Sequence, residues 1–191
     1  MFETFRADLL RAQGGTWQGR AAALRTFLNA FGLQALAVYR LGRWLRGSAR
    51  RPRRWPVALL LWPAYGLLCA LVRKAYDVRI ELSADVGPGL IIHHFGGIRL
   101  RACRLGSNCV IHHEVRLEPE AGPGAGAARG PLLGDRIWIG PHARVLGPIQ
   151  VGSGATLGAG ADVERDVPSN ALMLGSPARV ARLDYDNASL P

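Results

Sequence analysis

An aliphatic residue recurs at every sixth position along the C-terminal half of this chain, and a second small or aliphatic residue follows four places after each one. The first series is Leu133, Ile139, Val145, Val151, Leu157 and Val163, and the second is Ile137, Ala143, Ile149, Ala155, Ala161 and Val167. This period is neither the roughly 3.6 residues of a helix nor the alternation of a half-buried strand. It predicts a mainly β fold, a parallel β-helix of hexapeptide repeats.

An earlier run repeats the pattern, with one additional residue between its two halves. It comprises Val86, Ile92, Ile98, Leu105, Ile111 and Leu117. Each hexad is expected to form one short strand and a turn, and three hexads to close one triangular coil. The spaced aliphatic side chains then point inward and stack about 4.8 Å apart on the next coil. The glycines that follow many of them are expected at corners that need an unusual backbone angle.

The segment 118–131, EPEAGPGAGAARGP, lies between the two runs and contains no ladder residue. Its glycine, alanine and proline content predicts a loop that protrudes from one corner of the β-helix. Loops of this kind often border a functional site, although a merely tolerated insertion gives the same pattern.

Charge divides the chain into two expected units, a helical extension over 1–80 and a β-helix domain over 81–191. The first unit carries 14 basic and 3 acidic side chains, and the second carries 10 basic and 11 acidic ones. The positive charge surrounds the apolar part of the extension, which favours an anionic membrane surface reached through residues 40–80. No nucleic-acid-binding motif is present, so no nucleic-acid partner is expected.

The extension contains two stretches with helical character. Residues 21–47 place apolar residues and arginines at three- and four-residue spacing, which predicts one amphipathic helix. Residues 56–72 carry no charge, but they are short for a membrane span, contain Pro63 and have basic residues at both ends. A single crossing is therefore disfavoured. Two alternatives stay open: a shallow interfacial or re-entrant hairpin, or a helical pair packed on a neighbouring subunit.

The N-terminus contains acidic residues and no uninterrupted apolar stretch, so no secretory signal is predicted. Cys69, Cys103 and Cys109 form an odd set without metal-type spacing, which predicts reduced cytoplasmic thiols. Cys109 falls on an inward position and is expected in the core. These features predict a cytoplasmic protein that can attach peripherally to the inner face of the cytoplasmic membrane.

Two histidine doublets, His93–His94 and His112–His113, each follow an inward aliphatic residue. They start one full coil apart, so they are expected to stack on the same corner. Exposed side chains are expected, because a buried histidine would interrupt the aliphatic column. Ordinary surface polarity is the plain alternative. A zinc site is not favoured, because no cysteine or carboxylate is spaced to complete it.

Over residues 86–181 the motifs match a known family. GPGLIIHHFGGIRL, IHHEVRL, a glycine-rich loop and GPLLGDRIWIGPHARVLGPIQVGSGATLGAG resemble the serine O-acetyltransferase-like branch of the left-handed β-helix acyltransferases. Within that branch the chain is most similar to colanic-acid-type exopolysaccharide O-acetyltransferases. The resemblance implies a left-handed coil, a homotrimer and a helical N-terminal segment. It also implies transfer of an acetyl group from acetyl-CoA to a hydroxyl, without a metal.

The resemblance also implies roles for individual residues. His94 matches the general base and His113 the second histidine corner, so both are candidate catalytic residues. His93, His112 and Glu114 stand beside them and are expected to bind substrate. The coil edge that holds the pantetheine arm in the family, between two subunits, corresponds to Gly140, Pro141, Gly158 and Ala159. An imidazole suits the role of base, because it is largely neutral near physiological pH.

The residue that orients His94 is open, because Arg79 occupies the position where serine acetyltransferases have an orienting acid. Glu81 and His113 are the candidates for that role. His142, in the hexad IGPHAR, is expected at a corner near the coenzyme edge.

Two further positions depart from true serine acetyltransferases. His93 stands where they have an acid, and Gly130 where they have a histidine. Because these losses remove groups that recognise free serine, the expected acceptor is a sugar hydroxyl in exopolysaccharide or surface-glycan biosynthesis. Serine O-acetylation in cysteine biosynthesis and a non-catalytic scaffold are the alternatives.

Overall fold

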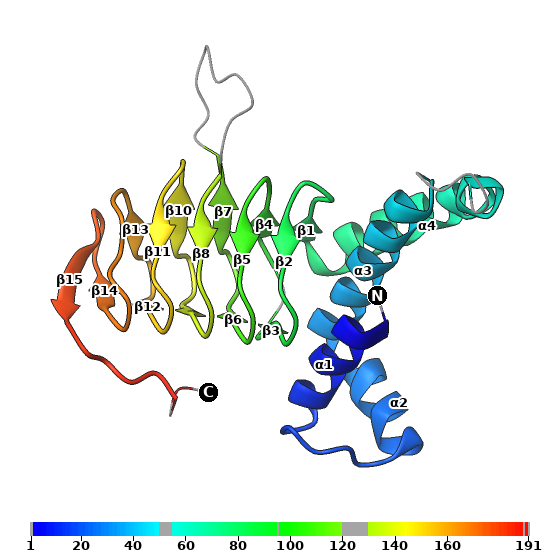
Figure 1. Cartoon of the computed structure of the whole chain (residues 1–191), viewed down its shortest axis with the longest axis horizontal. Helices are drawn as coiled ribbons and strands as arrows, with labels where there is room; N and C mark the ends of the chain where they lie inside the picture. Colours follow the sequence, from blue (N-terminus) through cyan, green and yellow to red (C-terminus); the bar gives the residue numbers. More distant parts are fainter. Residues whose placement is uncertain (1, 50–54, 95, 120–129, 189, 191) are drawn as a thin grey trace, which may run out of the picture.

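The computed structural model describes residues 2–49, 55–94, 96–119, 130–188 and 190. Four helices come first: α1 (Phe2–Ala12), α2 (Arg20–Asn29), α3 (Phe31–Ala49) and α4 (Trp55–Tyr76). The short strands that follow form a rod that extends away from the helical end of the molecule (Figure 1).

From β1 to β13 the strands repeat in a cycle of three, so that each strand pairs with the third strand after it. One sheet holds β1 (Val78–Ile80), β4 (Ile98–Leu100), β7 (Arg116–Glu118), β10 (Arg144–Leu146) and β13 (Asp162–Val163). The second holds β2 (Asp85–Val86), β5 (Arg104–Leu105), β8 (Leu132–Leu133) and β11 (Gln150–Val151). The third holds β3 (Ile91–Ile92), β6 (Val110–Ile111), β9 (Trp138–Ile139), β12 (Thr156–Leu157), β14 (Leu172–Leu174) and β15 (Arg179–Arg182). The pairs are parallel except β14 with β15, which confirms the parallel β-helix.

The hexad ladder sets the register between coils. Ile111 pairs with Ile139, and Ile139 pairs with Leu157. Both inward series between positions 133 and 167 are at most 7% exposed, and they form one core with residues of the earlier run. Cys109 is part of this core, as predicted. The core is therefore a continuous apolar column inside the coils, and polar functional side chains must lie at the corners.

The corner glycines serve a different purpose from the predicted one. Gly140 and Gly158 do not have positive φ, but a Cβ on Gly140 would lie 2.8 Å from the backbone nitrogen of Ala159 on the next coil. The positive φ falls two residues later, at Gly160 and at His142, where it is 60°. The glycine after each inward residue therefore permits close approach of two coils rather than an unusual backbone angle.

The single amphipathic helix predicted over 21–47 is wrong, because the structure divides it into α2 and α3. The two axes are bent by 97°, and Ala30 between them has an extended backbone (φ −99°, ψ 92°). The elbow allows α3 to contact β1 and β3 of the first coil, while α2 packs on α1 and α3. The extension is thus joined to the β-helix of its own chain.

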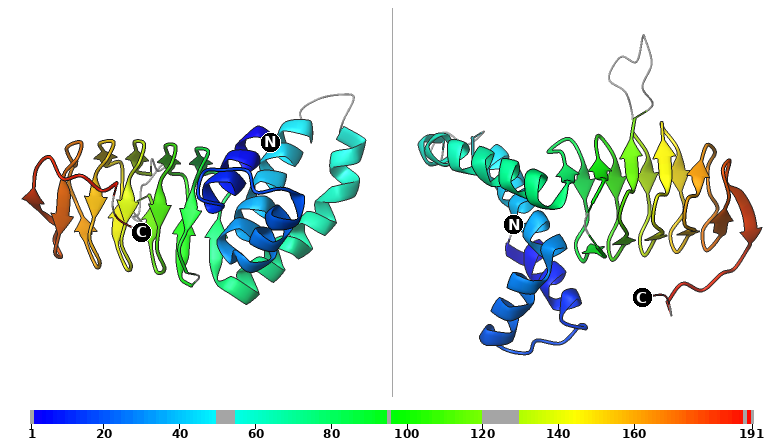
Figure 2. Two further views of the ribbon diagram at one scale, coloured as in Figure 1. Left: turned by 90° about the horizontal axis from the view of Figure 1, so that it is seen from below. Right: turned by 180° about the vertical axis from the view of Figure 1, so that it is seen from behind.

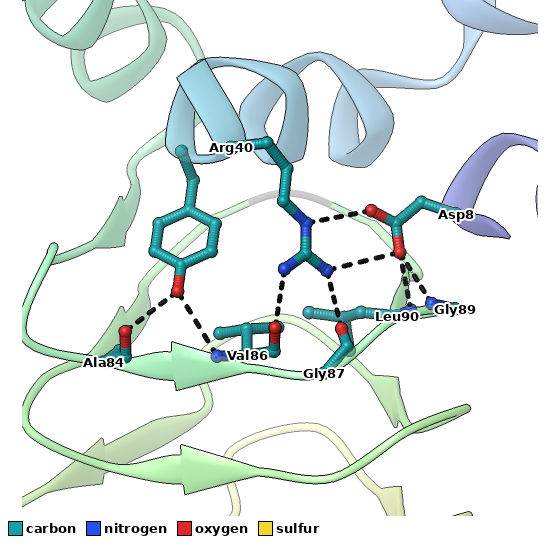
Figure 3. A network of polar contacts seen from close by, with 8 residues as sticks. Asp8, Arg40, Ala84, Val86, Gly87, Gly89 and Leu90 are labelled. Carbon is teal, nitrogen blue, oxygen red and sulfur yellow. Dashed lines mark hydrogen bonds and ion pairs between the residues drawn. The ribbon is translucent and has the colours of Figure 1, made fainter. Parts of the chain in front are cut away.

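A buried ion pair closes the N-terminal end of the β-helix (Figure 3). Asp8 Oδ2 on α1 lies 3.1 Å from Arg40 Nε on α3. Asp8 accepts hydrogen bonds from the backbone N–H groups of 89–90, and Arg40 donates to the carbonyl oxygens of 86–87. Because the first coil has no preceding coil to pair with, these side chains satisfy backbone groups at an otherwise open edge.

Helix α4 packs along α3 through Ala58 and Tyr65. It begins at the end of the molecule away from the β-helix and runs back to the first coil (Figure 2), where Val72 and Tyr76 pack against the core. Over Ala58–Tyr76 it is long and apolar enough to cross a membrane, and α2 with α3 would also qualify if taken as one bent span. Core helices of soluble proteins can meet the same criterion, but only 6% of the apolar stretch of α4 is buried.

Strand pairing begins at Val78, shortly before the expected domain boundary at 81. Within the predicted loop 118–131, residues 120–129 lie outside the described residues. The loop ends belong to the coils: Glu118 closes β7, and Gly130 is buried with a Cβ position 2.5 Å from the carbonyl oxygen of Ala102.

Candidate active site

The two histidine doublets lie on one corner of the β-helix, as predicted. The strands before them, β3 and β6, pair in parallel. The rings of His93 and His112 stack, with centroids 5.2 Å apart and 23° between planes. The rings of His94 and His113 meet edge-on at 5.9 Å. Four imidazoles on two neighbouring coils are therefore in contact range of one another.

His142 extends this column to the third coil. Its ring meets that of His113 edge-on at 5.3 Å, and its backbone N–H donates to the His113 carbonyl oxygen at 3.0 Å. The chain has five histidines, so all of its imidazoles lie on this single corner.

His112 is buried, which corrects the expectation that all four doublet side chains are exposed. It is 9% exposed and packs on Trp138 with a centroid distance of 4.6 Å. The aliphatic column stays intact because the neighbouring Ile111 holds the inward position. His112 Nδ1 lies 3.0 Å from the carbonyl oxygen of Ile139. Since a carbonyl only accepts, Nδ1 carries the proton and Nε2 of the neutral ring is an acceptor.

Two of these imidazoles are held in the neutral form by their surroundings. Partial burial lowers the pKa of His93, and His94 and Arg11 lower it further. Burial also lowers the pKa of His112, outweighing the hydrogen bond with Ile139, which raises it. Both rings therefore act as uncharged hydrogen-bonding groups near neutral pH. Within the described residues, no cluster of three or more histidine, cysteine or carboxylate side chains is arranged to hold a metal ion.

The predicted coenzyme residues continue the same corner on the next two coils. The register of β6, β9 and β12 places Gly140–Pro141 and Gly158–Ala159 in line with His112–His113. Gly140 and Gly158 are buried, whereas Pro141 is half-buried and Ala159 exposed. Small side chains thus follow the imidazoles along one edge, which leaves room for an extended ligand beside them.

A small pocket lies between the α2–α3 elbow and the histidine corner. Its volume is about 180 Å³, and it is lined by Asn29, Ala30, Phe31, Gly32, Ile92, His93 and His94. At Gly32 a Cβ would lie 2.6 Å from Ile92 Cβ, so glycine allows α3 to approach β3 closely. Sequence analysis missed the elbow because it predicted an unbroken helix. The glycine inside the helical pattern was the available signal.

Of the two candidates for orienting His94, the structure brings only His113 to it. Glu81 follows β1 and therefore lies at a different corner, where it accepts a hydrogen bond from Ser83 at 3.0 Å. The candidacy of Glu81 is wrong, because the first and third strands of a coil end at different corners.

Two carboxylates flank the turn that follows His94. Asp77, which sequence analysis did not consider, accepts a hydrogen bond from the Gly97 N–H at 3.2 Å and lies 3.6 Å from Arg79. Glu114 lies on the other side of Gly97, where a Cβ would be 2.7 Å from its carboxyl carbon. Glu114, predicted to bind substrate, is exposed and has a φ of 60°.

Comparison with known proteins places this chain in a family. No protein-family model matches the chain. A serine acetyltransferase of Synechococcus elongatus is 35% identical, over all of this chain and 75% of the relative. The chain belongs to the serine acetyltransferase family. A relative from Mycobacterium tuberculosis, also named serine acetyltransferase, is 31% identical over 94% of this chain and 73% of its own length.

Other relatives are considerably longer. The serine acetyltransferase of Escherichia coli K12 is 33% identical over 83% of this chain, which spans 54% of that relative. The chain thus spans about half the length of several curated relatives that it matches. These relatives are serine acetyltransferases, not the exopolysaccharide enzymes to which the histidine motifs were likened.

Solved structures of serine acetyltransferases share this architecture. The soybean apoenzyme superposes with a TM-score of 0.74 at 31% identity, over 94% of this chain and 68% of the other. The Neisseria gonorrhoeae enzyme gives 0.76 at 27% identity, over 97% and 66%. The likeness therefore includes the N-terminal helices as well as the β-helix.

Proposed function

We propose that this chain is an acetyl-CoA-dependent O-acetyltransferase with His94 as its general base. The observation that carries the proposal is the position of His94. Its exposed imidazole lines the pocket at the elbow and stands beside the small-residue edge of the coils. Acyl transfer needs a general base placed between the acceptor alcohol and the thioester, and here the pocket would hold the alcohol and the small-residue edge the thioester.

The geometry supports a direct transfer. His94 takes the proton of the acceptor hydroxyl as its oxygen attacks the thioester carbonyl carbon. The tetrahedral oxyanion then collapses, the carbon–sulfur bond breaks, and the imidazolium returns the proton to the sulfur of CoA. His113 is the proposed positioning partner, because its ring meets His94 edge-on at 5.9 Å. His93, which lines the pocket, is proposed to provide an uncharged group beside the acceptor, and the buried His112 stacks against it.

Gly140, Pro141, Gly158 and Ala159 are proposed to hold the pantetheine arm. Within one chain this edge is open on one side, since Ala159 is exposed. A neighbouring subunit of a homotrimer is proposed to cover it. The proposed compartment is the cytoplasm, in keeping with three cysteines that are free thiols in the structure.

L-Serine is the acceptor that family membership supports, and a pocket of about 180 Å³ suits a small molecule. A sugar hydroxyl is the second candidate, favoured by one observation. The described residues that line the pocket include imidazoles but no carboxylate, so no side chain among them offers a negative charge to the ammonium group of free serine.

The test is CoA release from acetyl-CoA by the purified full chain, with L-serine in one series and neutral or nucleotide-linked sugars in the other. Release that depends on serine supports serine O-acetylation, and release only with a sugar supports the second candidate. No acceptor-dependent release in either series, with no heat of CoA binding in calorimetry, would overturn the proposal in favour of a scaffold.

A further inference from the structure

Helix α4 exposes an apolar face that no other described residue of the chain covers. Ala58, Tyr65 and Cys69 recur at helical spacing and pack toward α3. Leu60 and Leu67 lie on the opposite side of the helix and are 79% and 63% exposed. This inverts the usual pattern, in which the outer face of a surface helix is polar.

The apolar surface continues from α4 across a groove to α2. The groove has a volume of about 450 Å³, and its apolar lining includes Phe27, Leu28, Val38, Leu68, Leu71 and Val72. Leu24 and Leu28 of α2 are each 59% exposed. One surface thus joins three helices, and soluble monomers rarely expose a continuous apolar patch of this kind without a partner.

The three helices that form this surface carry basic side chains and no acidic ones. The sequence contains no aspartate or glutamate between positions 9 and 76. Arg73 and Lys74 are exposed in the last turn of α4, and the sequence RRPRR precedes the helix. Basic residues therefore stand in the last turn of α4 and directly before its first residue, and residues 56–72 between them carry no charge.

This charge pattern distinguishes between two possible partners for the apolar surface, a second copy of the chain and an anionic lipid surface. A second copy placed on the same face would bring two sets of cations together, with no acidic side chain in this segment to separate them. An anionic lipid surface supplies both requirements at once, acyl chains for the leucines and phosphates for the cations.

We propose that the outer face of α4, with the groove beside it, binds the surface of an anionic membrane. The helix lies in the interfacial layer and does not cross it, because basic residues at both ends favour the same side for both. Leu60 and Leu67 enter the acyl boundary, while Arg73 and Lys74 contact headgroup phosphates. The β-helix remains in the aqueous phase.

The experiment is sedimentation of the full chain with vesicles. One set contains phosphatidylcholine with roughly 30% phosphatidylglycerol, and the other contains phosphatidylcholine alone. At about 0.05 M salt, the bound fraction is expected to be several-fold higher with the anionic vesicles, and about 0.5 M salt is expected to remove most of that difference. Equal binding to both vesicles, or binding to neither, would overturn the proposal.

A pair of variants assigns the surface. The double variant Leu60→Gln/Leu67→Gln is expected to weaken binding to anionic vesicles at least about tenfold, because it removes two leucines that the bilayer would bury. Leu132→Gln/Leu183→Gln is the matched control, since both leucines are half or more exposed on the β-helix side of the molecule. Equal binding by both double variants would exclude α4 as the contact. A wild-type oligomer that Leu60→Gln/Leu67→Gln dissociates, without vesicle binding, would show that a second copy covers the face.

Discussion

The carboxylate of Asp8 and the guanidinium of Arg40 meet at 3.1 Å, with the two side chains 0% and 7% exposed. Each group also bonds the backbone of the first coil (Figure 3). Burial raises the pKa of Asp8 despite the attraction of Arg40, which lowers it. The contact therefore specifies where α1 and α3 sit, and so where the elbow meets the histidine corner.

Replacing Asp8 by alanine is expected to lower the free energy of unfolding by about 3–5 kcal/mol, because Arg40 would stay buried without its counter-charge. Urea denaturation measures the loss. Asp85→Ala is the matched control: Asp85 pairs with Arg43 at the surface, so its loss should cost at most about 1 kcal/mol. Similar losses for the two variants would contradict the role of the buried pair.

Replacing His94 by asparagine is expected to lower kcat by roughly 10²- to 10⁴-fold, the range typical of a lost general base. Asparagine is chosen because His94 has a φ of 63°, a region that asparagine tolerates. Since the side chain is exposed, the unfolding midpoint should stay unchanged. His142→Asn, with a φ of 60° on the same corner, is the control and should keep most of the activity. Full activity of the His94 variant would rule out this mechanism.

Two glycine-to-alanine substitutions are expected to change the stability of the protein in opposite directions. Gly140→Ala places a Cβ 2.8 Å from the Ala159 nitrogen, so it should destabilise the protein by about 1–3 kcal/mol. Gly66→Ala in α4 meets nothing within 4 Å, so it should stabilise by about 0.5–1 kcal/mol. Thermal unfolding of both variants checks the difference, and stabilisation by Gly140→Ala would contradict the close approach of the coils.

Stability is expected to fall as pH drops below about 6.5. The pKa values of His93 and His112 are lowered in the folded protein from 6.5. Below 6.5 the unfolded chain therefore binds more protons, and stability declines until the pH passes the lowered folded pKa values; above 6.5 this contribution is constant. Urea unfolding at pH 7.5 and 5.5 should show a smaller decline for His112→Phe than for the wild type. An equal decline would contradict the burial effect at His112.

Two of the three thiols are expected to be unreactive in the folded protein. Burial raises the pKa of Cys103 to about 12 and that of Cys109 to about 11. A thiol reagent should therefore modify only the partly exposed Cys69 before unfolding. The Cys69→Ser variant should show no fast reaction, and fast modification of that variant would place another cysteine at the surface.

The β-helix was predictable because its determinants are local and periodic. A side chain such as Ile139 points inward in every copy of the hexad, so spacing alone placed it on Leu157, three hexads further along. Its pairing with Ile111 spans the loop and comes from the structure. The same arithmetic brought His93 onto His112. It did not indicate that Trp138 covers His112. Trp138 precedes the inward Ile139 on the next coil, and the hexad pattern does not specify where a side chain at that position points.

The helical extension shows the limit of such reasoning. Its apolar periodicity is continuous through Ala30, so the 97° elbow left no break in that periodicity, and Gly32 was the available signal. Asp77 likewise gave no signal, because its approach to Gly97 follows from strand pairing between β1 and β4.

By itself the sequence determined the repeating coil, the corner shared by the histidines and the apolar, basic character of the extension, since each follows from residue spacing or composition. Only the tertiary structure decided which groups surround His94 and which face of α4 stays open. Both depend on contacts between residues far apart in the chain, such as Asp8 with Arg40. A local sequence pattern cannot predict such contacts, because their energies arise only when the chain is folded.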